Sequence, residues 1–181
     1  ANETAAKFIS PCSAGYYRDA ARSTALGDCQ DIGNGKQGQT GSTIGGTYAS
    51  TGATHQVACI KGKYEPDGNA ACQPCALGTF QGSDGQTSCA NVSAGKVGRR
   101  VAGARSTVAD SIHETAATVE EGCVAGSWRQ ASSGNSNCVV VPAGSVGRIA
   151  ADADADANET AAKFISPCSA GYYRDAARST A

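Results

Sequence analysis

Cysteine is the residue type whose chemistry dominates this chain. Nine cysteines occur in 181 residues, and eight of them fall into four pairs whose members are 13 to 17 positions apart. Each pair opens with the pattern Cys-x-x-Gly-x-aromatic, as in Cys12-Ser-Ala-Gly15-Tyr-Tyr17. Thiols with this regular spacing are typical of disulfides that hold a small extracellular fold together. The expected disulfide cysteines are Cys12, Cys29, Cys59, Cys72, Cys75, Cys89, Cys123 and Cys138.

The pairing is open in the crowded middle of the chain. The first two and the last two of these cysteines stand apart from the others and are expected to bond as pairs. If all four modules are homologous, the middle pairs are Cys59–Cys72 and Cys75–Cys89, and the alternative is the interleaved pairing Cys59–Cys75 with Cys72–Cys89. Cys168 opens a fifth copy without a closing cysteine in this chain. We expect Cys168 to be unpaired here or to pair with the next unit.

Catalytic and zinc chemistry have little support in the sequence. Cys72-Gln-Pro-Cys75 resembles a redox motif, but no strand–helix pattern surrounds it to lower a thiol pKa. His55 and His113 are isolated, so they form no zinc site with a cysteine pair. No serine or cysteine nucleophile stands in a recognisable motif with a base. We therefore expect no enzyme, no catalytic residue and no bound cofactor.

Two further groups of residues could bind or carry a ligand. Asp152, Asp154 and Asp156 alternate with alanine, so on a strand the three carboxylates would face one way and could bind Ca²⁺. We interpret this segment instead as a solvated linker. Three Asn-x-Ser/Thr sequons predict N-glycosylation of a secreted protein, at Asn2, Asn91 and Asn158.

The apolar content is too low for one large core. Although 40% of the residues count as hydrophobic, 34 are alanine and only 23 are Leu, Ile, Val or Phe. That is about one residue in eight, whereas core-forming domains usually exceed about one in five. The net charge of −1 gives no electrostatic reason to bind nucleic acid. No apolar run approaches the roughly 20 residues that span a bilayer, so we expect no membrane span.

The chain repeats itself on two scales. Residues 157–181 are identical to residues 1–25, which gives a period of 156 residues. We interpret this identity as one unit of a tandem array and the start of the next, and an engineered duplication is the alternative. The predicted divisions are long repeat 1 at 1–58, a short inserted disulfide module at 59–74, long repeat 2 at 75–122, long repeat 3 with an Ala/Asp linker at 123–156, and the start of the next unit at 157–181.

The spacing also predicts the local structure. Glycine three residues after cysteine suits a tight turn with positive φ, and turn residues such as Pro66-Asp-Gly68 lie between paired cysteines. Ile32, Val92 and Val141 stand where Cys75 stands after Cys72, which predicts hairpins that keep the turn without the disulfide. The predicted fold is therefore mostly β and irregular: an elongated array of small disulfide-closed β-hairpin modules, with little helix and no single large core. The best helix candidate is Ala157–Phe164, capped by Asn158.

The pattern Cys-x-x-Gly-x-aromatic, closed by Cys-x-x-Cys and followed by a second copy, resembles the cysteine-rich repeats of ephrin-receptor-like type. Residues 59–89 match it best, through Cys59, Gly62, Tyr64, Cys72, Cys75, Gly78, Phe80 and Cys89. The chain departs from the pattern where valine or isoleucine replaces the next opening cysteine and where long spacers intervene. The resemblance implies an extracellular, elongated protein with an adhesive or structural role.

These observations favour a structural subunit of an extracellular filament or cell-surface fibre. Its expected partners are copies of itself, with glycans as covalent modifications. The alternative is an adhesin or receptor ectodomain that binds a protein or a glycan. An exposed aromatic cluster would favour the alternative, whereas aromatic rings packed on the disulfides would favour the structural role; the rings are Tyr17, Tyr64, Phe80 and Trp128.

Overall fold

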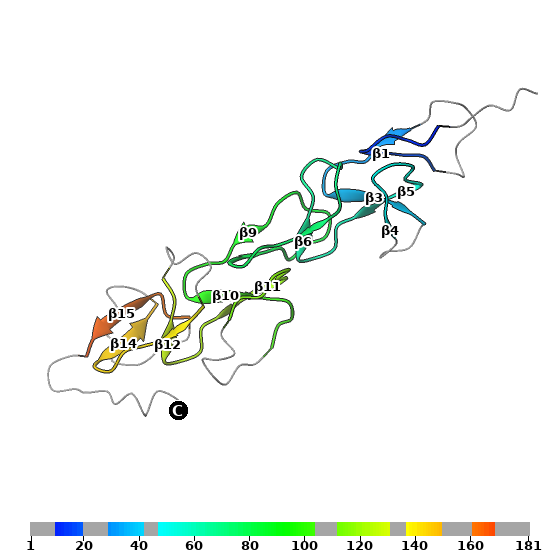
Figure 1. The fold of residues 1–181 in the computed structure, drawn as a ribbon. Coiled ribbons are helices and arrows are strands. Elements are labelled where there is room, and N and C mark those ends of the chain that lie inside the picture. The colour runs from blue at the N-terminus through cyan, green and yellow to red at the C-terminus, as the bar shows by residue number, and fades with distance from the viewer. Residues whose placement is uncertain are drawn as a thin grey trace, which may run out of the picture. The chain divides into compact units, whose positions relative to one another are not determined.

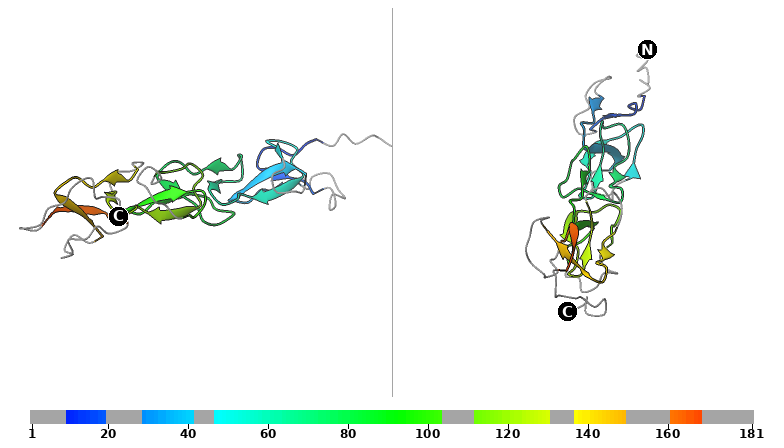
Figure 2. Two further views of the ribbon diagram at one scale, coloured as in Figure 1. Left: turned by 90° about the horizontal axis from the view of Figure 1, so that it is seen from below. Right: turned by 90° about the vertical axis from the view of Figure 1, so that its left-hand side faces the viewer.

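The described part of the chain is built from short β-strands. The computed structural model describes residues 10–19, 29–41, 47–103, 112–130, 137–149 and 161–168. Within these ranges the strands are two to five residues long, and Figures 1 and 2 show arrows and loops without a helix. The predicted fold class, mostly β with small disulfide-closed modules, is confirmed.

Each of four two-stranded hairpins has one strand after the opening cysteine of a pair and the other directly after the closing cysteine, and we call each hairpin with its disulfide a disulfide module. They pair antiparallel where the register is defined, for example Trp128 with Val139. The module strands are β1 (Tyr16–Tyr17) with β2 (Gln30–Asp31), β6 (Lys63–Tyr64) with β7 (Gln73–Pro74), β8 (Thr79–Phe80) with β9 (Ala90–Asn91), and β12 (Ser127–Trp128) with β13 (Val139–Val140). Their disulfides are Cys12–Cys29, Cys59–Cys72, Cys75–Cys89 and Cys123–Cys138.

Three of the modules are followed by a longer antiparallel hairpin without a disulfide, which we call a disulfide-free hairpin. The three consist of β3 (Lys36–Thr40) with β5 (His55–Ala58) and β4 (Thr47–Tyr48), β10 (Lys96–Arg99) with β11 (Val119–Gly122), and β14 (Ser145–Arg148) with β15 (Phe164–Pro167). A module and its disulfide-free hairpin make one structural repeat. The three structural repeats span residues 12–58, 75–122 and 123–167.

The chain divides into two compact units. The first contains Ala1–Gln73 and Asp84–Ser88, and the second contains Pro74–Ser83 and Cys89–Ala181. Structural repeat 1 and the Cys59–Cys72 module lie in the first unit, whereas structural repeats 2 and 3 lie in the second apart from Asp84–Ser88. The apolar core of the second unit includes Val97, Cys123 and Cys138, which form one buried cluster.

Glycine makes the turn at the start of both kinds of hairpin. Every module turn has a left-handed glycine three residues after its opening cysteine, and every disulfide-free hairpin has one at the matching place. The φ values are 81° for Gly15, 78° for Gly62, 82° for Gly78 and Gly126, 75° for Gly35 and Gly144, and 73° for Gly95. A side chain is disfavoured in this region by about 1–2 kcal/mol, which explains why the sequence repeats glycine there.

A second left-handed residue closes each structural repeat. It is Gly52, Ala116 or Ala161, and its N–H donates to the carbonyl of the opening cysteine, at 2.8 Å in all three repeats. The following alanine is buried and forms a parallel bridge with the aromatic residue of the module. The bridges are Tyr17 with Ala53, Phe80 with Ala117, and Trp128 with Ala162. The aromatic strand is thereby fixed to the segment that returns along its own repeat.

The Ala157–Phe164 helix expectation is wrong over its described residues. Ala161 is left-handed with φ 60°, Ala162 forms the bridge to Trp128, and Phe164 begins β15. Alanine favours helix only weakly, and these tertiary contacts outweigh that preference. Asn158, the predicted cap, lies outside the described residues.

Small residues form the interior of each disulfide-free hairpin. Gly38, Gly98 and Gly147 occupy equivalent positions, three residues after the turn glycine. A Cβ on any of them would come within 2.9–3.0 Å of the Cβ of the buried alanine in the same repeat. It would also crowd the buried Ile32, Val92 or Val141, respectively. Each hairpin therefore packs glycine, alanine and one branched side chain together instead of building a large core.

Candidate functional site: the junctions between consecutive modules

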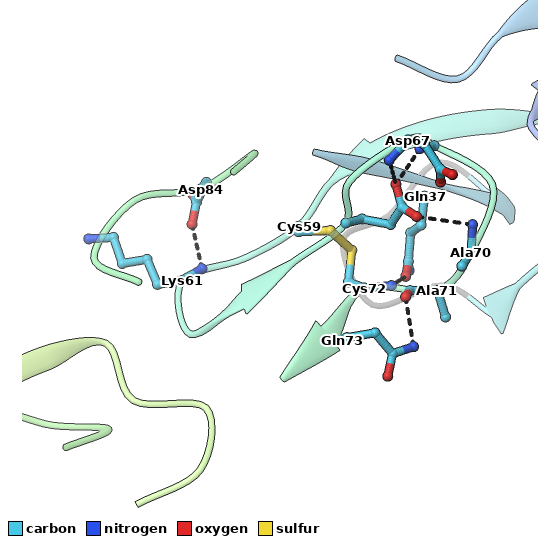
Figure 3. Close-up of a disulfide and its surroundings, with 11 residues drawn as sticks. Gln37, Cys59, Lys61, Asp67, Ala70, Ala71, Cys72, Gln73 and Asp84 are labelled. Atoms are coloured by element: carbon cyan, nitrogen blue, oxygen red, sulfur yellow. Dashed lines mark hydrogen bonds between the residues drawn. A yellow bond between two sulfur atoms is a disulfide. The ribbon is translucent and has the colours of Figure 1, made fainter. Parts of the chain in front are cut away.

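The first junction joins the disulfide-free hairpin β3–β5 to the Cys59–Cys72 module. The N–H of Gly35 donates to the carbonyl of Glu65, at 2.8 Å, and the carbonyl of Gly35 accepts from the N–H of Cys59, at 2.9 Å. The side chain of Gln37 reaches the same module, where its Oε1 accepts from the N–H of Cys72 at 2.9 Å (Figure 3). The turn glycine thus bonds the next module through its backbone, and the side chain of Gln37 bonds the closing cysteine of that module.

A buried carboxylate holds the loop of this module. Glu65 is fully buried, and its carboxylate accepts hydrogen bonds from the N–H groups of Asp67, Gly68 and Ala70 (Figure 3). These donors replace the water that the charge would otherwise bind. The neighbouring Asp67 is exposed, and hydrogen bonds from Asn69 lower the pKa of its carboxyl. The carboxylates here organise a turn.

The second junction joins β10–β11 to the Cys123–Cys138 module in the same way. Gly95 donates to the carbonyl of Arg129 at 2.8 Å and accepts from the N–H of Cys123 at 2.7 Å. Val97 occupies the place of Gln37 and belongs to the buried cluster with the two module cysteines. Arg129 is buried, which lowers the pKa of its guanidinium, and it donates to the carbonyl of Ser93 at 3.0 Å. An arginine still stays protonated in a protein.

The two junctions therefore share their backbone contacts and differ in their side chains. In each, the turn glycine bonds the residue that follows the aromatic of the next module, which is Glu65 after Tyr64 and Arg129 after Trp128. A Cβ on Gly35 would lie 2.0 Å from the carbonyl oxygen of Gly85, and one on Gly95 would lie 1.9 Å from that of Ala161. Only glycine fits at both turns.

The third turn, at Gly144, has the same conformation and a different environment. Its carbonyl accepts from the N–H of Cys168 at 2.9 Å, as the two other turns accept from Cys59 and Cys123. Gly144 is exposed, whereas Gly35 and Gly95 are buried. A Cβ on Gly144 would meet no described residue within 4 Å. Among the described residues, Gly144 therefore makes one of the two junction hydrogen bonds, the one that its carbonyl accepts.

The Cys59–Cys72 module obtains its closing pair from an unexpected place. Gly85, with φ 69°, donates to the carbonyl of Cys59 at 2.7 Å, and Gln86 accepts from the N–H of Glu65 at 3.1 Å. These bonds match those of Gly52 and Ala53 in structural repeat 1. Lys61 adds a hydrogen bond from its N–H to the carboxylate of Asp84, at 2.8 Å (Figure 3). The short module is thus completed by residues from the loop between Cys75 and Cys89.

The returning strand carries most of the chemical variation between the repeats. In structural repeat 2, Glu120 forms an ion pair with Lys96 at 2.5 Å and accepts hydrogen bonds from Ser93. Burial alone would raise the pKa of Glu120, but hydrogen bonds from Lys96 and Ser93 outweigh it and lower the pKa. In structural repeat 1 the matching pair is Lys36 with Gln56, at 3.3 Å. In structural repeat 3 the two positions hold Ser145 and Ile165.

Five of the ten exposed large apolar side chains of the described residues lie in structural repeat 3. Val139 and Val140 on β13, Ile149 after β14, and Phe164 and Ile165 on β15 are between 37% and 51% exposed. The residues that match β13 are Gln30 and Asp31 in repeat 1 and Ala90 and Asn91 in repeat 2. Those that match Phe164 and Ile165 are His55 with Gln56 and Val119 with Glu120. The same backbone therefore presents a more apolar surface in one repeat.

The residues singled out from the sequence fall into three groups. The eight module cysteines form the four disulfides within their modules, so Cys72 and Cys75 bond to different partners, while Cys168 is a half-buried free thiol. Asn91 is exposed on β9. Outside the described residues lie Asn2, Asn158, Asp152, Asp154 and Asp156.

The described residues contain no cluster of three or more potential metal ligands, and none of their secondary structure is a helix that could cross a membrane. His113 is buried: its ring Nδ1 accepts from the N–H of Gly98 at 3.1 Å, and its backbone N–H donates to the side-chain oxygen of Asn137. His113 is therefore part of the internal hydrogen bonding of the second unit.

Sequence reasoning missed the second left-handed residue and the glycine–alanine packing. Both had a signal. Glycine recurs three residues after each disulfide-free turn, at Gly38, Gly98 and Gly147, and two small residues follow threonine at 52–53, 116–117 and 161–162. The exposed apolar side chains of β13 and β15 were missed because the sequence alone does not give the strand register, and because Phe164 was placed in the expected helix.

The comparisons with known proteins agree with this module type. Residues 62–107 match the family model described as Tyrosine-protein kinase ephrin type A/B receptor-like. The match begins within the Cys59–Cys72 module and continues past β10, and these residues are a cysteine-rich ephrin-receptor-like segment. No curated protein matches the chain. The module type and its disulfides point to an extracellular protein, secreted or held at the cell surface.

Proposed function

We propose that the chain is part of a receptor- or adhesin-type ectodomain that binds a protein through structural repeat 3. The observation that carries this proposal is the exposure of Val139, Val140, Phe164 and Ile165, where repeats 1 and 2 hold mostly polar residues at the matching positions. Exposed apolar surface of this kind is typical of interaction sites. The ephrin-receptor-like segment supports the receptor class. The proposed role is non-enzymatic.

The exposure of the aromatic rings does not distinguish a binding ectodomain from a structural filament subunit. Tyr17, Tyr64, Phe80 and Trp128 are all partly buried, so they neither form an exposed cluster nor disappear into a core. The exposed side chains of repeat 3 are mostly aliphatic. Aliphatic surface gains most from burial against another apolar surface, which supports a protein partner over a glycan.

A transplant of polar residues tests the binding role. The four-residue variant Val139→Gln, Val140→Asp, Phe164→His and Ile165→Gln gives repeat 3 the residues of repeat 1 at the same positions. The labelled chain is applied to arrays of extracellular proteins and, separately, of glycans. We expect binding to a protein that falls at least tenfold in this variant. The matched control, Gln30→Val with Asp31→Val, should leave that binding unchanged.

Two results would contradict this proposal. Binding that the four-residue variant leaves intact would move the site elsewhere. Binding to glycans alone would replace the protein partner by a sugar. Circular dichroism of both variants shows whether the fold is retained.

A second function, a structural subunit of a filament or fibre, has one specific observation in its favour. The same junction bonds occur at Gly35 and Gly95, and a third turn of the same conformation stands open at Gly144. Repetition of one contact along a chain suits end-to-end growth. Electron microscopy and sedimentation across a range of concentrations test it, and a monomer at every concentration without fibres would reject self-association.

Glycosylation at Asn91 belongs to the proposed extracellular setting. The side chain is exposed, and the sequon serine, Ser93, is held by Glu120. Mass spectrometry of chain secreted from cells should show a glycan at this position. The variant Asn91→Gln should lose that mass, and an unmodified Asn91 in the secreted wild-type chain would contradict the prediction.

A further inference from the structure

We propose that Asn34 is a modification site that the first junction controls: its side chain loses ammonia and closes to a succinimide when the hydrogen bonds of Gly35 open. This inference is independent of the binding role proposed above. It starts from the sequence, in which Asn34 is the one asparagine that precedes a glycine. The residues before the other turn glycines are alanine, lysine or leucine.

The reaction needs the two residues and water. The backbone nitrogen of Gly35 attacks the side-chain carbonyl carbon of Asn34, and a carbon–nitrogen bond forms between them. The bond from that carbon to the side-chain nitrogen breaks, and this nitrogen leaves as ammonia with the proton that Gly35 gives up. Water then opens the succinimide ring at either carbonyl, which gives aspartate or isoaspartate at position 34. Nothing is oxidised or reduced.

Glycine favours this attack because it has no side chain to hinder its nitrogen. The same property makes glycine suitable for the turn, where Gly35 has φ 75°. The side chain of Asn34 is exposed, so water reaches it. The turn therefore places a reactive pair of residues at the surface of the junction.

The closed junction keeps the attacking nitrogen from reacting. Gly35 is buried, and its N–H donates to the carbonyl of Glu65 at 2.8 Å. Its carbonyl accepts from the N–H of Cys59 at 2.9 Å, so both of its backbone polar groups are bonded. The carbonyl oxygen of Gly85 covers the same residue, 2.0 Å from the position of a Cβ on Gly35. Succinimide formation therefore requires a local opening of the junction.

Isoaspartate would prevent the junction from closing again. Its main chain runs through the former side-chain carbonyl carbon, which adds one carbon atom between residues 34 and 35. Gly35 bonds Glu65 and Cys59 of one module at the same time, and the longer main chain no longer brings both groups to hydrogen-bond distance. Aspartate adds a charge and leaves the main chain unchanged. The isoaspartate product thus makes a transient opening permanent.

The first test uses the wild-type chain. It is incubated in mildly alkaline buffer, both native and unfolded in urea with its disulfides intact. After reduction, mass spectrometry of the tryptic peptide of residues 23–36 follows the conversion of Asn34. We expect this conversion to be at least tenfold slower in the native chain.

A variant that loosens the junction should remove this protection. Gly85→Val places a β-branched residue at φ 69° and displaces the carbonyl that covers Gly35. We expect conversion of Asn34 in the native variant to be at least fivefold faster than in the native wild type. Gly41→Val is the matched control, because Gly41 has φ 97° and a Cβ there meets nothing within 4 Å. It introduces the same kind of backbone strain in the same unit and should leave the conversion rate unchanged.

The second test concerns the product. Chromatography isolates the chain with isoaspartate at position 34, and amide hydrogen exchange is followed by NMR. We expect the amides of Gly35 and Cys59 to exchange at least tenfold faster than in the unmodified chain. Asn34→Asp is the matched control, since it has the same charge and a normal main chain. It should keep the protection of both amides.

Four outcomes would overturn the proposal. The first is conversion of Asn34 at the same rate in the native and the unfolded chain, a comparison that holds even if Gly85→Val does not fold. The second is an Asn34 that stays unmodified in the unfolded chain. The third is a Gly41→Val variant that accelerates the conversion as much as Gly85→Val. The fourth is an isoaspartate chain that keeps both amides protected. A failed protein-binding test leaves all of these measurements unaffected.

Discussion

Structural repeats 2 and 3 have the same backbone and different surfaces. Both join a disulfide module to a disulfide-free hairpin, and both place a left-handed alanine before the buried alanine that bridges to the aromatic residue. They differ at the turn, where Gly95 is covered and Gly144 is open, and on the returning strand, where Glu120 is matched by Ile165. The comparison separates the contacts that define the repeat from those that give each copy its own properties.

The defining contacts are made by backbone groups and by glycine and alanine. In both copies, the N–H of the left-handed alanine donates to the carbonyl of the opening cysteine. Both also pack a strand glycine against the buried alanine, Gly98 against Ala117 and Gly147 against Ala162. The variable contacts are made by exposed side chains of the strands. A repeat of this kind can change its surface from charged to apolar while the backbone stays the same.

The largest expected difference between the repeats is at the turn glycine. Gly95→Ala should destabilise its junction by about 3 kcal/mol, because an L-residue with positive φ costs about 1–2 kcal/mol and the clash with the Ala161 carbonyl adds about 1–3 kcal/mol. Gly144→Ala should cost only the first term, about 1–2 kcal/mol. Urea unfolding followed by the fluorescence of Trp128, the single tryptophan, measures both. Equal costs would show that the junction at Gly95 contributes no more than the turn.

A smaller effect should be the same in both repeats. Gly98→Ala and Gly147→Ala each push a Cβ against an alanine Cβ, at 3.0 and 2.9 Å, and against a valine, at 3.1 and 3.2 Å. We expect each to cost about 1–3 kcal/mol through overpacking. Hydrogen exchange of β10–β11 and β14–β15, followed by mass spectrometry, compares the two. A cost in only one repeat would mean that the two repeats do not share the glycine–alanine packing.

The ion pair of repeat 2 should give a pH dependence that repeat 3 lacks. The lowered pKa of Glu120 means that its stabilising contribution is present above the ordinary carboxyl pKa and is lost as the pH falls through the lowered value. We expect about 0.5–1 kcal/mol for this partly exposed pair. Glu120→Gln should remove the acid-dependent part of β10–β11 protection, whereas Ile165→Gln should leave the pH profile of β14–β15 unchanged. An identical profile for Glu120→Gln and wild type would assign the acid dependence to other groups.

The smallest expected effect is a stabilisation. Ala116 has φ 56° and Ala161 has φ 60°, whereas structural repeat 1 uses Gly52 at this position. Replacement by glycine relieves the left-handed strain but frees the unfolded chain, and the balance should favour Ala116→Gly by about 0.5 kcal/mol. Ala161→Gly should stabilise the fold by a similar amount, and Gly52→Ala should lower the free energy of unfolding. Thermal unfolding of the three variants measures the differences, and a destabilising Ala116→Gly would show that the alanine methyl group contributes more than its strain.

Much of the fold follows from the cysteine pattern, because a fixed spacing between cysteine, glycine and an aromatic residue specifies one turn and one hairpin. The disulfide-free hairpins were also predictable from Ile32, Val92 and Val141, since the turn glycine is kept when the cysteine is lost. The alanine-rich segment was predicted to be helical because intrinsic preference is all that a single segment shows. The left-handed turn at Ala161 and the bridge at Ala162 depend instead on contacts with Cys123 and Arg129, which lie far away in the sequence.

The junctions were less accessible to sequence reasoning. Gly35 and Gly95 were recognisable as turn residues, but their second role, the hydrogen bond to Glu65 or Arg129, uses only backbone atoms of the partner. A backbone acceptor leaves no residue preference at its position, so one partner is acidic and the other basic. The apolar surface of repeat 3 could likewise not be predicted from the sequence, because it depends on the strand register. In that register Ile165 lies opposite Gly147, as Glu120 lies opposite Gly98.

The position of Gly85 and Gln86 affects how such a chain can evolve. These residues complete the Cys59–Cys72 module, although they are encoded within the loop between Cys75 and Cys89. A duplication or deletion with its boundary between Cys72 and Cys75 would therefore separate a module from the residues that close it. A copy that starts at Cys59 and ends beyond Gln86 keeps both. The heritable unit is consequently longer than the interval from one cysteine to its partner, and successive units overlap along the sequence.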